Sequence, residues 1–423
     1  MKQGKRGDLS LRNVLLPGGR EADITLAEGI VTHVGSPVPC DATIDCSGLY
    51  CIPAGVDMHV HMRGGVESRK EDWRTGSMAA IAGGVTVVVD QPNTIPPLTS
   101  TGAFRARVAD AAAHSLCHFA INGGVTPDAE ISALWGAGAM VFGETFLAPS
   151  THGEALTDPD LVLLFDRIRR LGALATIHAE QVTGGPADSL TAHDASRPAP
   201  GEVRAIGRAR QLAGACRLHF CHLTTRAAVS AAAPCTQEVT PHHLFLSVED
   251  FDDAEGTGKV NPPLRTEAER TALWSAWDQI DVIASDHAPH TAEEKTTSFR
   301  NAPAGFPGVE TMLPLLMAAV LEGTISLESV VQKVSATPAD LLGIPSAGFR
   351  VGDRADFALF PHTTRKIAVE DLHSRAGWSP FAGLSAVFPS RVIMGGKQVF
   401  AEGEFMPSAP CWLPGRGYKV PQR

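Results

Sequence analysis

Residues 51–65 read CIPAGVDMHVHMRGG, an apolar run that carries two histidines and ends in an arginine and two glycines. In an extended strand, residues two positions apart lie on the same face. His59 and His61 are therefore predicted to point in one direction, with Arg63 beyond them on the same side. The apolar side chains predicted to point the other way are Met58, Val60 and Met62.

Seven further short runs of β-strand character follow, and Ala-, Leu- and Arg-rich segments of helical periodicity separate most of them. Strands that alternate with helices in this way predict an α/β fold, a (β/α)8 barrel of the TIM type. A continuous doubly wound sheet is the alternative. The predicted strands are residues 56–61, 85–91, 117–122, 139–145, 174–179, 217–222, 236–241 and 281–286.

The two ends of the chain have a different pattern, in which short alternating strands flank glycine-centred turns. Examples are VLLPGGREADITLAEGIVTHVG near the start and SRVIMGGKQVFAEGEF near the end. These ends are predicted to pair as one small β-sandwich domain. The predicted boundaries are residues 1–52 for its N-terminal part, 53–347 for the barrel and 348–423 for its C-terminal part.

Composition limits the classes of partner. The chain has 423 residues, of which 44% are hydrophobic and 19% charged, and its formal net charge is -10. This charge offers no basic face to a nucleic acid or an anionic membrane, and no run of about 18 apolar residues suggests a membrane span. The eight cysteines include no C-x-x-C pair, which favours reduced thiols over disulfides. We expect a cytoplasmic protein that acts on a small molecule.

Polar residues close five of the predicted strands. In a (β/α)8 barrel the active site lies at the carboxyl ends of the strands, so these residues are expected to converge. Imidazoles and carboxylates without a thiolate suit Zn²⁺, although Mn²⁺, Co²⁺ or Ni²⁺ fits the same donors. Six ligands are too many for one catalytic zinc and predict two metal ions. They are His59, His61, Glu144, His178, His222 and Asp286.

Several longer motifs resemble those of dihydroorotases, in the cyclic amidohydrolase group of the metal-dependent amidohydrolase superfamily. They include HVHMR, CTQEVTPHHLFLS, KVNPPLR, IASDHAPH and GFPGVETMLPLL, and the resemblance runs from about residue 51 to residue 342. It implies a metal-dependent barrel that interconverts N-carbamoyl-L-aspartate and L-dihydroorotate, a step of pyrimidine biosynthesis. A homodimer is a further expectation from the family.

The resemblance also implies a role for each ligand. His59 and His61 would bind the more buried metal and His178 and His222 the second, with Asp286 completing the set. Many relatives carry a carboxylated lysine as the bridging ligand, where this chain has a glutamate. Glu144 presents two oxygens on a flexible stem and is predicted to bridge both metals; the alternative is that it binds only one, or that the site is mononuclear.

The expected reaction is the hydrolysis of a cyclic amide and, in the reverse direction, its formation by ring closure. A hydroxide that bridges the metals would attack the ring carbonyl. Asp286, beside that hydroxide, is the candidate proton shuttle, which takes the proton and delivers it to the departing nitrogen.

Arg63 is predicted to hold the free carboxylate of the substrate, because a planar guanidinium can form two parallel hydrogen bonds to it. The resemblance adds Asn93 and His290 as further ligands of this carboxylate and Asn261 as a contact to the ring. In the alternative interpretation Arg63 forms a surface salt bridge, and the candidate partners are Glu67 and Glu71.

Two rival functions use the same barrel. A hydantoinase or allantoinase would act on an uncharged cyclic amide, and its substrate would not need Arg63, Asn93 and His290 together. A non-catalytic scaffold would be expected to lose metal ligands, whereas every ligand position here keeps a donor.

Two other features are expected to have different roles. His242 and His243 are predicted to be structural, because adjacent residues on a strand diverge and cannot easily serve one metal. Residues 145–153 match the position of a mobile catalytic loop in the family that the chain resembles.

Overall fold

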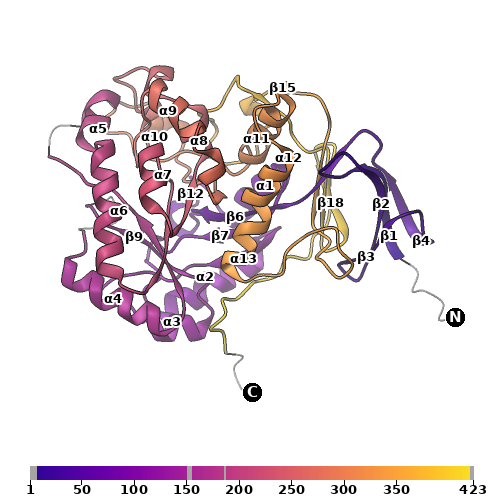
Figure 1. Cartoon of the computed structure of the whole chain (residues 1–423), viewed down its shortest axis with the longest axis horizontal. Coiled ribbons are helices and arrows are strands. Elements are labelled where there is room, and N and C mark those ends of the chain that lie inside the picture. The colour runs from indigo at the N-terminus through magenta and orange to yellow at the C-terminus, as the bar shows by residue number, and fades with distance from the viewer. Residues whose placement is uncertain (1–6, 150–154, 185–186, 420–423) are drawn as a thin grey trace.

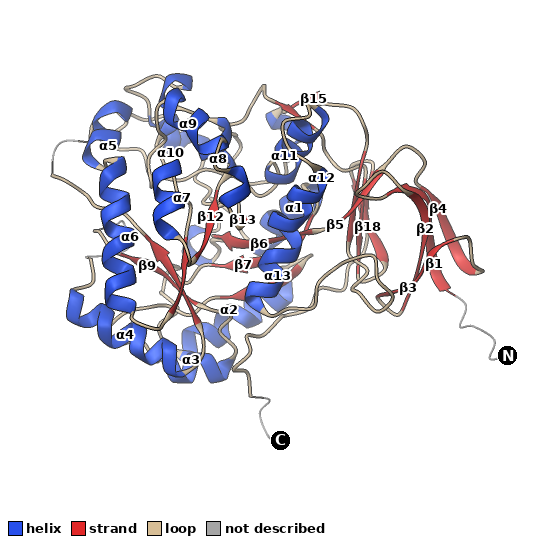
Figure 2. Cartoon of the chain, in the orientation of Figure 1, coloured by secondary structure: helices blue, strands red, loops and turns tan. Residues whose placement is uncertain are grey.

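The computed structural model describes residues 7–149, 155–184 and 187–419. Figure 1 shows a large body, in which helices surround strands, beside a smaller body made mostly of strands. Figure 2 shows the same division by secondary structure, with the helices confined to the large body. The end of the 145–153 loop lies outside the described residues.

The eight predicted strands of the large body are present, and all of their pairings are parallel. They form one sheet in the order β6-β7-β8 and another in the order β13-β12-β11-β10-β9. Their bounds are β6 (Gly55–Val60), β7 (Val85–Asp90), β8 (His118–Ile121), β9 (Phe142–Phe146), β10 (Leu174–His178), β11 (Arg217–Phe220), β12 (Thr236–Val239) and β13 (Val282–Ile283).

Two single parallel bridges join these sheets into a ring. Gly123, after β8, bridges to Phe142 of β9, and Val60 of β6 bridges to His287, beyond β13. The His61 amide donates to the carbonyl of His287 at 2.8 Å. The predicted (β/α)8 fold class is therefore confirmed. The doubly wound alternative is wrong, because the first and last strands of an open sheet do not pair with each other.

Helices cover the outside of the ring. They are α1 (Trp73–Ala82), α2 (Thr101–His114), α3 (Ile131–Ala137), α4 (Asp158–Arg170), α5 (Leu190–Ser196), α6 (Ala199–Ala213), α7 (Arg226–Ala232), α8 (Pro241–Phe245), α9 (Glu267–Trp274), α10 (Ala292–Lys295), α11 (Met312–Leu321), α12 (Leu327–Val331) and α13 (Thr337–Leu342). Among the described residues, none of these helices combines the length and the apolar composition needed to cross a membrane.

Helix α4 shows how the sequence specifies these elements. Thr157 caps its start by accepting a hydrogen bond from the Asp160 amide, and acidic residues fill the first turn. Basic residues fill the last turn, where they complement the helix dipole. The buried residues recur at helical spacing and turn one stripe toward the barrel. These buried residues are Leu161, Leu164, Phe165 and Ile168.

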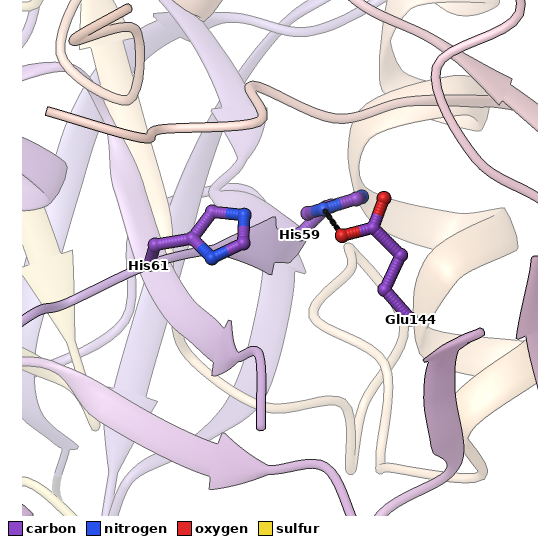
Figure 3. Close-up of side chains that lie close together, drawn as sticks. All are labelled: His59, His61 and Glu144. Atoms are coloured by element: carbon purple, nitrogen blue, oxygen red, sulfur yellow. Dashed lines mark ion pairs between the residues drawn. The ribbon is translucent and has the colours of Figure 1, made fainter. Parts of the chain in front are cut away.

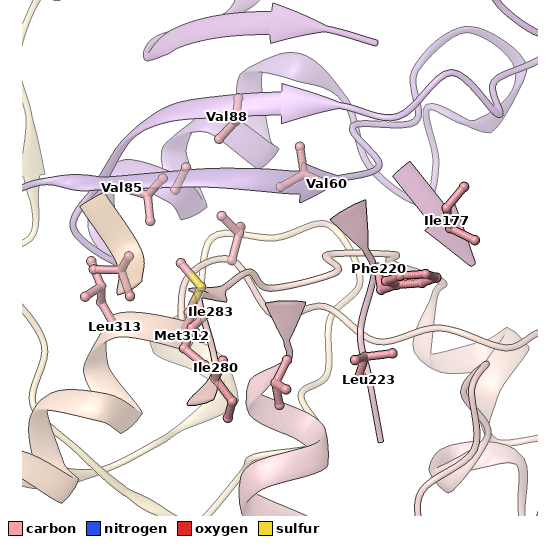
Figure 4. Close-up of a cluster of buried hydrophobic side chains, with 14 of the residues drawn as sticks. Val60, Val85, Val88, Ile177, Phe220, Leu223, Ile280, Ile283, Met312 and Leu313 are labelled. Carbon is pink, nitrogen blue, oxygen red and sulfur yellow. The ribbon is translucent and has the colours of Figure 1, made fainter. Parts of the chain in front are cut away.

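A single hydrophobic cluster connects the strands to the surrounding helices. Val60, Val85 and Val88 from the first strands belong to the same cluster as Met312 and Leu313 of α11, and Figure 4 shows Leu313 next to Val85. Each of these side chains is almost fully buried. The strands are hydrophobic on both faces, as expected for a parallel sheet that is covered on both sides.

The strand that opens the barrel departs from regular alternation. Asp57 pairs with Val88 and Val60 pairs with Asp90. Three residues along β6 therefore cover the same length as two residues along β7. Such a bulge rotates the side chains on one side of it relative to those on the other. Met58 accordingly packs in a different buried cluster from Val60, and the prediction that they share a face is wrong.

The small body is built from both chain ends, as predicted. Its nine-stranded sheet has the order β19-β18-β17-β14-β5-β1-β2-β3, and β4 pairs with β1. The two ends meet where β5 runs antiparallel to β14, with Ile52 opposite Ala358. The strands are β1 (Gly7–Leu15), β2 (Glu21–Ala27), β3 (Ile30–Gly35), β4 (Cys40–Asp45), β5 (Tyr50–Pro53), β14 (Phe357–Phe360), β17 (Arg391–Met394), β18 (Lys397–Ala401) and β19 (Glu404–Phe405).

Two parts of the C-terminal region leave this sheet and contact the barrel. The last described residues pass beneath it, where the Leu413 amide donates to the Phe119 carbonyl at 2.8 Å. A longer excursion between β14 and β17 includes the hairpin of β15 (Arg365–Lys366) and β16 (Ser385–Ala386). All eight cysteines of the chain are free, in agreement with the predicted reduced thiols.

Candidate metal centre and substrate cavity

Glu144 lies at the centre of the converging strand ends. Its Oε1 atom is 2.6 Å from Nδ1 of His178 and 2.7 Å from Nε2 of His222. Its Oε2 atom is 3.7 Å from Nε2 of His59. Figure 3 shows this carboxylate facing His59, with His61 beside it. One carboxylate thus contacts residues from three other strand ends.

Asp286 faces the same group from the end of β13. Its Oδ1 atom lies 3.4 Å from Nε2 of His59 and 3.2 Å from Nε2 of His61. Two sets of possible ligands therefore share Glu144, and within each set the ligand atoms lie within 4.8 Å of one another. The sets are His59, His61 and Glu144, and Glu144, His178 and His222.

The burial and the hydrogen bonding of these residues fit divalent metal ions. Nε2 of His59 is buried and has no hydrogen-bond partner among the described residues, although two carboxylates face it. A buried nitrogen without a partner is costly, and a cation between it and those carboxylates would satisfy all three groups. The structure thus brings all six predicted ligands into one donor set of imidazoles and carboxylates.

The charges in this group depend on one another. Burial alone would raise the pKa of the Glu144 carboxyl, but His178 and its hydrogen bond hold it well below its usual range. Burial opposes protonation of His178, yet Glu144 and Glu180 raise its pKa to about 10. In a form without metal, protons on the imidazoles compensate the carboxylates, so protons and metal ions compete for the same atoms.

Three residues of the site have left-handed backbone conformations. The φ angles are 46° for Arg63, 37° for His222 and 45° for Asp286. Residues other than glycine rarely adopt this region, and when they do they cluster at functional sites. Each of the three follows shortly after a barrel strand, where the chain must turn sharply to leave the ring. Arg63 therefore reaches the cavity through a turn and not through the strand alternation that we predicted.

Two buried carboxylates that sequence reasoning missed hold the histidines from behind. Oε1 of Glu238 is 2.6 Å from Nδ1 of His59, and Oε2 of Glu180 is 2.5 Å from Nε2 of His178. Such a carboxylate fixes the tautomer of a ligating histidine and makes it more basic. The available signal was the charge of Glu238 within the predicted barrel strand at residues 236–241 and the position of Glu180 two residues after a predicted ligand.

Glu238 extends this network deeper into the barrel. Its second oxygen, Oε2, is 3.1 Å from Nε2 of His219, whose Nδ1 is 3.0 Å from the Thr236 hydroxyl. Burial would raise the pKa of Glu238, but His59 and the hydrogen bond from His219 lower it to about 2. The carboxylate is therefore charged, and its two oxygens serve two histidines.

A cavity of about 570 Å³ opens above the metal ligands. Eight of the ten predicted site residues line it, while His59 and His222 lie below, in contact with Glu144. A cavity of this size suits a small-molecule ligand. The predicted residues in its wall are His61, Arg63, Asn93, Glu144, His178, Asn261, Asp286 and His290.

Arg63 is buried at the end of the cavity away from Glu144's partners. Its Nε atom donates to the Pro289 carbonyl at 3.3 Å, and its Nη2 atom is 3.4 Å from Nε2 of His290. Within the described part of the chain, no carboxylate oxygen lies within 4 Å of it. The predicted alternative of a surface salt bridge is therefore not what the structure shows. Burial lowers the pKa of this guanidinium, and an anion in the cavity would compensate its charge.

The neighbours of Arg63 have free polar atoms. Burial, followed by the effect of Arg63, lowers the pKa of His290 to about 2, so that its imidazole is neutral. Nδ1 of His290 and Oδ1 of Asn261 are buried without a hydrogen-bond partner among the described residues. Asn93 also lines the cavity, and its Oδ1 atom is 2.9 Å from Nδ1 of His61. Its amide NH₂ group then remains available to a ligand.

Neither of the two adjacent histidines belongs to the groups of described residues whose atoms lie close enough together to hold a metal ion. His243 is 2.8 Å from the Thr240 hydroxyl through Nδ1 and 3.2 Å from the Pro262 carbonyl through Nε2. The prediction that His242 and His243 lie on a strand is wrong, because they lie in α8, which begins at Pro241. Proline is favoured in the first turn of a helix, and this ends β12 earlier than predicted.

Known proteins resemble this chain in sequence and in structure. Residues 50–399 match the model of the Amidohydrolase family. A dihydroorotase of Methanosarcina acetivorans is 39% identical over 94% of this chain and 91% of its own length. A dihydroorotase of Halobacterium salinarum is also 39% identical, over 92% of this chain and 96% of its own.

Solved structures resemble the whole chain. The L-hydantoinase (dihydropyrimidinase) of Arthrobacter aurescens has a TM-score of 0.90 at 28% identity, covering 96% of this chain and 100% of its own. A dihydropyrimidinase of Brevibacillus agri has a TM-score of 0.86 at 25% identity, over 97% and 99%. The matched family model and the curated relatives agree across the barrel and its flanking strands. The chain therefore belongs to the amidohydrolase family and, within it, to the dihydroorotase family.

Proposed function

We propose that this chain is a dihydroorotase, which interconverts N-carbamoyl-L-aspartate and L-dihydroorotate in pyrimidine biosynthesis. The observation that carries the proposal is Arg63, a buried guanidinium without a carboxylate partner among the described residues, in the same cavity as the metal-ligand cluster. L-dihydroorotate joins the two groups that such a cavity would bind, a cyclic amide and a carboxylate. The names of the relatives point to the same reaction.

We propose that two divalent ions, Zn²⁺ in the first place and Mn²⁺, Co²⁺ or Ni²⁺ on the same donors, bind to this cluster. His59, His61 and Asp286 would hold one ion and His178 and His222 the other, with Glu144 shared between them. When bound, such a pair activates water at neutral pH and polarises the carbonyl of an amide. Glu238 and Glu180 would orient the two histidines that they contact.

The proposed roles of the side chains follow from their places in the cavity. Arg63, His290 and Asn93 bind the carboxylate, and Asn261 contacts the ring. This fixes the ring amide against Asp286. In hydrolysis, a bond forms between water oxygen and the ring carbonyl carbon, and the bond from that carbon to nitrogen breaks. Asp286 accepts the proton that water loses and donates it to the leaving nitrogen; ring closure is the reverse.

A hydantoinase-type activity is the second candidate, because the L-hydantoinase structure covers almost the whole chain. The carboxylate-binding end of the cavity discriminates between the two. An uncharged ring would leave the buried guanidinium of Arg63 without a direct carboxylate partner, whereas dihydroorotate supplies one.

The test is hydrolysis of L-dihydroorotate by the zinc-loaded protein, followed by ultraviolet absorbance, with dihydrouracil, hydantoin and allantoin as parallel substrates. Dihydrouracil is dihydroorotate without its carboxylate. We expect turnover of dihydroorotate and a loss of about 10² or more in kcat/KM in Arg63→Ala. Turnover of the uncharged rings alone, with Arg63→Ala unaffected, would contradict the proposal.

We further propose the domain boundaries 1–52, 53–347 and 348–423, a homodimer and a cytoplasmic location. The pairing of β5 with β14 supports the idea that the first and last of these segments form one unit. Limited proteolysis tests the boundaries, and light scattering of the purified protein tests the dimer.

A further inference from the structure

One segment of the C-terminal excursion lies against the mouth of the barrel. We call residues 373–378 the bracket segment. It belongs to the part of the chain between β14 and β17, and it contacts two barrel loops that are far apart in sequence. These are the loop after β6, which carries Arg63, and the loop after β13, which carries His290.

The bracket segment binds the first loop through Glu71 and its neighbours. The Ser374 hydroxyl donates to Oε2 of Glu71 at 2.5 Å. The carbonyl of Glu71 in turn accepts from the amide of Gly64, next to Arg63, at 3.0 Å. Arg375 adds an ion pair to Asp72, with its Nη2 atom 2.7 Å from Oδ2.

The same segment binds the second loop at His290. Nε1 of Trp378 donates to the His290 carbonyl at 2.8 Å. The Ala376 carbonyl accepts from the Ala292 amide at 2.9 Å. The Trp378 ring also packs edge-on against Phe306, with ring centroids 5.9 Å apart. The backbone that carries His290 is thus held from outside the barrel.

The metal ligands are held in a different way. Three of them, His59, Glu144 and His178, lie within barrel strands. Within the described residues no hydrogen bond or ion pair joins the bracket segment directly to any of the six. Loss of a bracket contact is therefore expected to move the carboxylate-binding residues while leaving the metal centre in place.

We infer that the bracket segment sets the relative positions of Arg63 and His290, and that Trp378 is a positioning residue for recognition of the substrate carboxylate. This inference rests on the proposed function, because it concerns the same carboxylate. Side chains on loops hold a ligand well only when other contacts fix the loops, and here one segment fixes both.

Trp378→Phe tests the inference, because it removes the N–H donor and keeps most of the ring. We expect KM for L-dihydroorotate to rise about 3- to 10-fold, the usual effect of one lost hydrogen bond, with kcat within about twofold. Turnover of dihydrouracil, which lacks the carboxylate, and the zinc content should not change. Ser374→Ala tests the Arg63 side by the same readouts, without removing a large side chain.

Trp274→Phe is the matched control. Nε1 of Trp274 also donates to a backbone carbonyl, that of Leu244 at 2.6 Å. Leu244 does not line the cavity, whereas His290, the acceptor of Trp378, does. We expect this variant to keep the KM of the parent for dihydroorotate. Equal losses on dihydroorotate and dihydrouracil, or equal KM changes in the Trp378 and Trp274 variants, would overturn the inference.

A binding measurement separates this inference from the proposed function. Orotate carries the same carboxylate on a planar ring, and its binding to the zinc-loaded protein can be measured by calorimetry. Parent protein that does not hydrolyse dihydroorotate would refute the proposed function. Weaker orotate binding in Trp378→Phe, but not in Trp274→Phe, would still support the role of the bracket segment, and unchanged binding would refute it.

Discussion

The two ends of the cavity are built differently. At the metal end, His59, Glu144 and His178 sit at the ends of barrel strands and contact one another within the ring. At the carboxylate end, Arg63 and His290 sit on loops, and their loops are held by a segment from far along the chain. Strands are fixed by their neighbours on both sides, whereas a loop depends on whatever packs against it.

This difference matches the division of labour between the ends. In the proposed function the metal end performs the chemistry, which requires ligand positions accurate to a fraction of an ångström. In the same proposal the carboxylate end selects the substrate, so that a change of substrate there would not need to disturb the catalytic atoms. The chain resembles a hydantoinase structure over almost its whole length, while its sequence relatives are named dihydroorotases. Both observations fit a family in which the metal end is shared and the substrate-recognition end differs.

The largest expected effect comes from the centre of the metal end. Glu144→Gln keeps the size of the side chain but removes the charge that three histidines face. We expect kcat/KM to fall by about 10³ or more, because metal activation contributes several kcal/mol. Metal analysis after dialysis should show fewer ions per chain. Glu202→Gln is the control, since Glu202 is also a buried glutamate but binds Thr224 outside the cavity; comparable losses in both variants would contradict the special role of Glu144.

Asn93 offers a way to separate the two ends, because it contacts His61 at the metal end and is proposed to bind the substrate carboxylate. Asn93→Asp keeps an oxygen for Nδ1 of His61 but places a second carboxylate where the substrate carboxylate should bind. Like charges in such proximity cost several kcal/mol, so KM for dihydroorotate should rise about 10²-fold. Dihydrouracil turnover and metal content should change much less. Steady-state kinetics measure KM and kcat for both substrates. A loss of turnover confined to dihydrouracil would contradict the placing of Asn93 beside the substrate carboxylate.

The carboxylates behind the histidines should have intermediate effects. Glu238→Gln keeps an acceptor for His59 but removes the charge. We expect the affinity for one metal ion to fall about 10- to 100-fold. Glu180→Gln should do the same for the ion that His178 binds. Titration with Co²⁺, followed by its visible absorption, would show which site is weakened, and unchanged affinity in both variants would mean that these carboxylates only fill space.

The same contrast between strands and loops explains how much could be predicted from sequence. Most barrel strands were recognisable as short apolar runs, and the ligands were recognisable because each of these polar residues closes such a run. Glu144 was found in this way although the matching residue is a lysine in many relatives. These signals are local, and the parallel ring converts them into a site without further information.

The remainder of the site depends on contacts between distant residues. Ser374 reaches Glu71 across 303 positions, and Glu238 reaches His59 across 179. No local pattern marks such partners, so the bracket segment and the carboxylates behind the histidines were not predicted. The bulge in β6 and the early end of β12 were also missed, because one extra residue or one proline outweighs the regular period.

The smallest expected effect concerns the anchor of the bracket segment. Nδ1 of His373 is 2.7 Å from Oε1 of Glu310, and this hydrogen bond, opposed by burial, raises the pKa of His373. Its protonated form therefore stabilises the fold fully below the ordinary histidine pKa of about 6.5, and this contribution is lost as the pH rises through the raised value. His373→Gln should destabilise the protein by about 0.5 kcal/mol at about pH 5.5, allowing for solvent screening, and by less at about pH 9.

Denaturant unfolding of the parent and of His373→Gln at both pH values measures this difference, and the parent at each pH corrects for every other titrating group. A variant that loses more stability at the higher pH would mean that the neutral imidazole, and not the imidazolium, anchors the segment. Because no hydrogen bond or ion pair among the described residues joins the bracket segment directly to a metal ligand, a destabilised anchor should also raise KM for dihydroorotate at the lower pH, while the metal content stays that of the parent. An equal effect on metal content would show that the two ends of the cavity are not held independently.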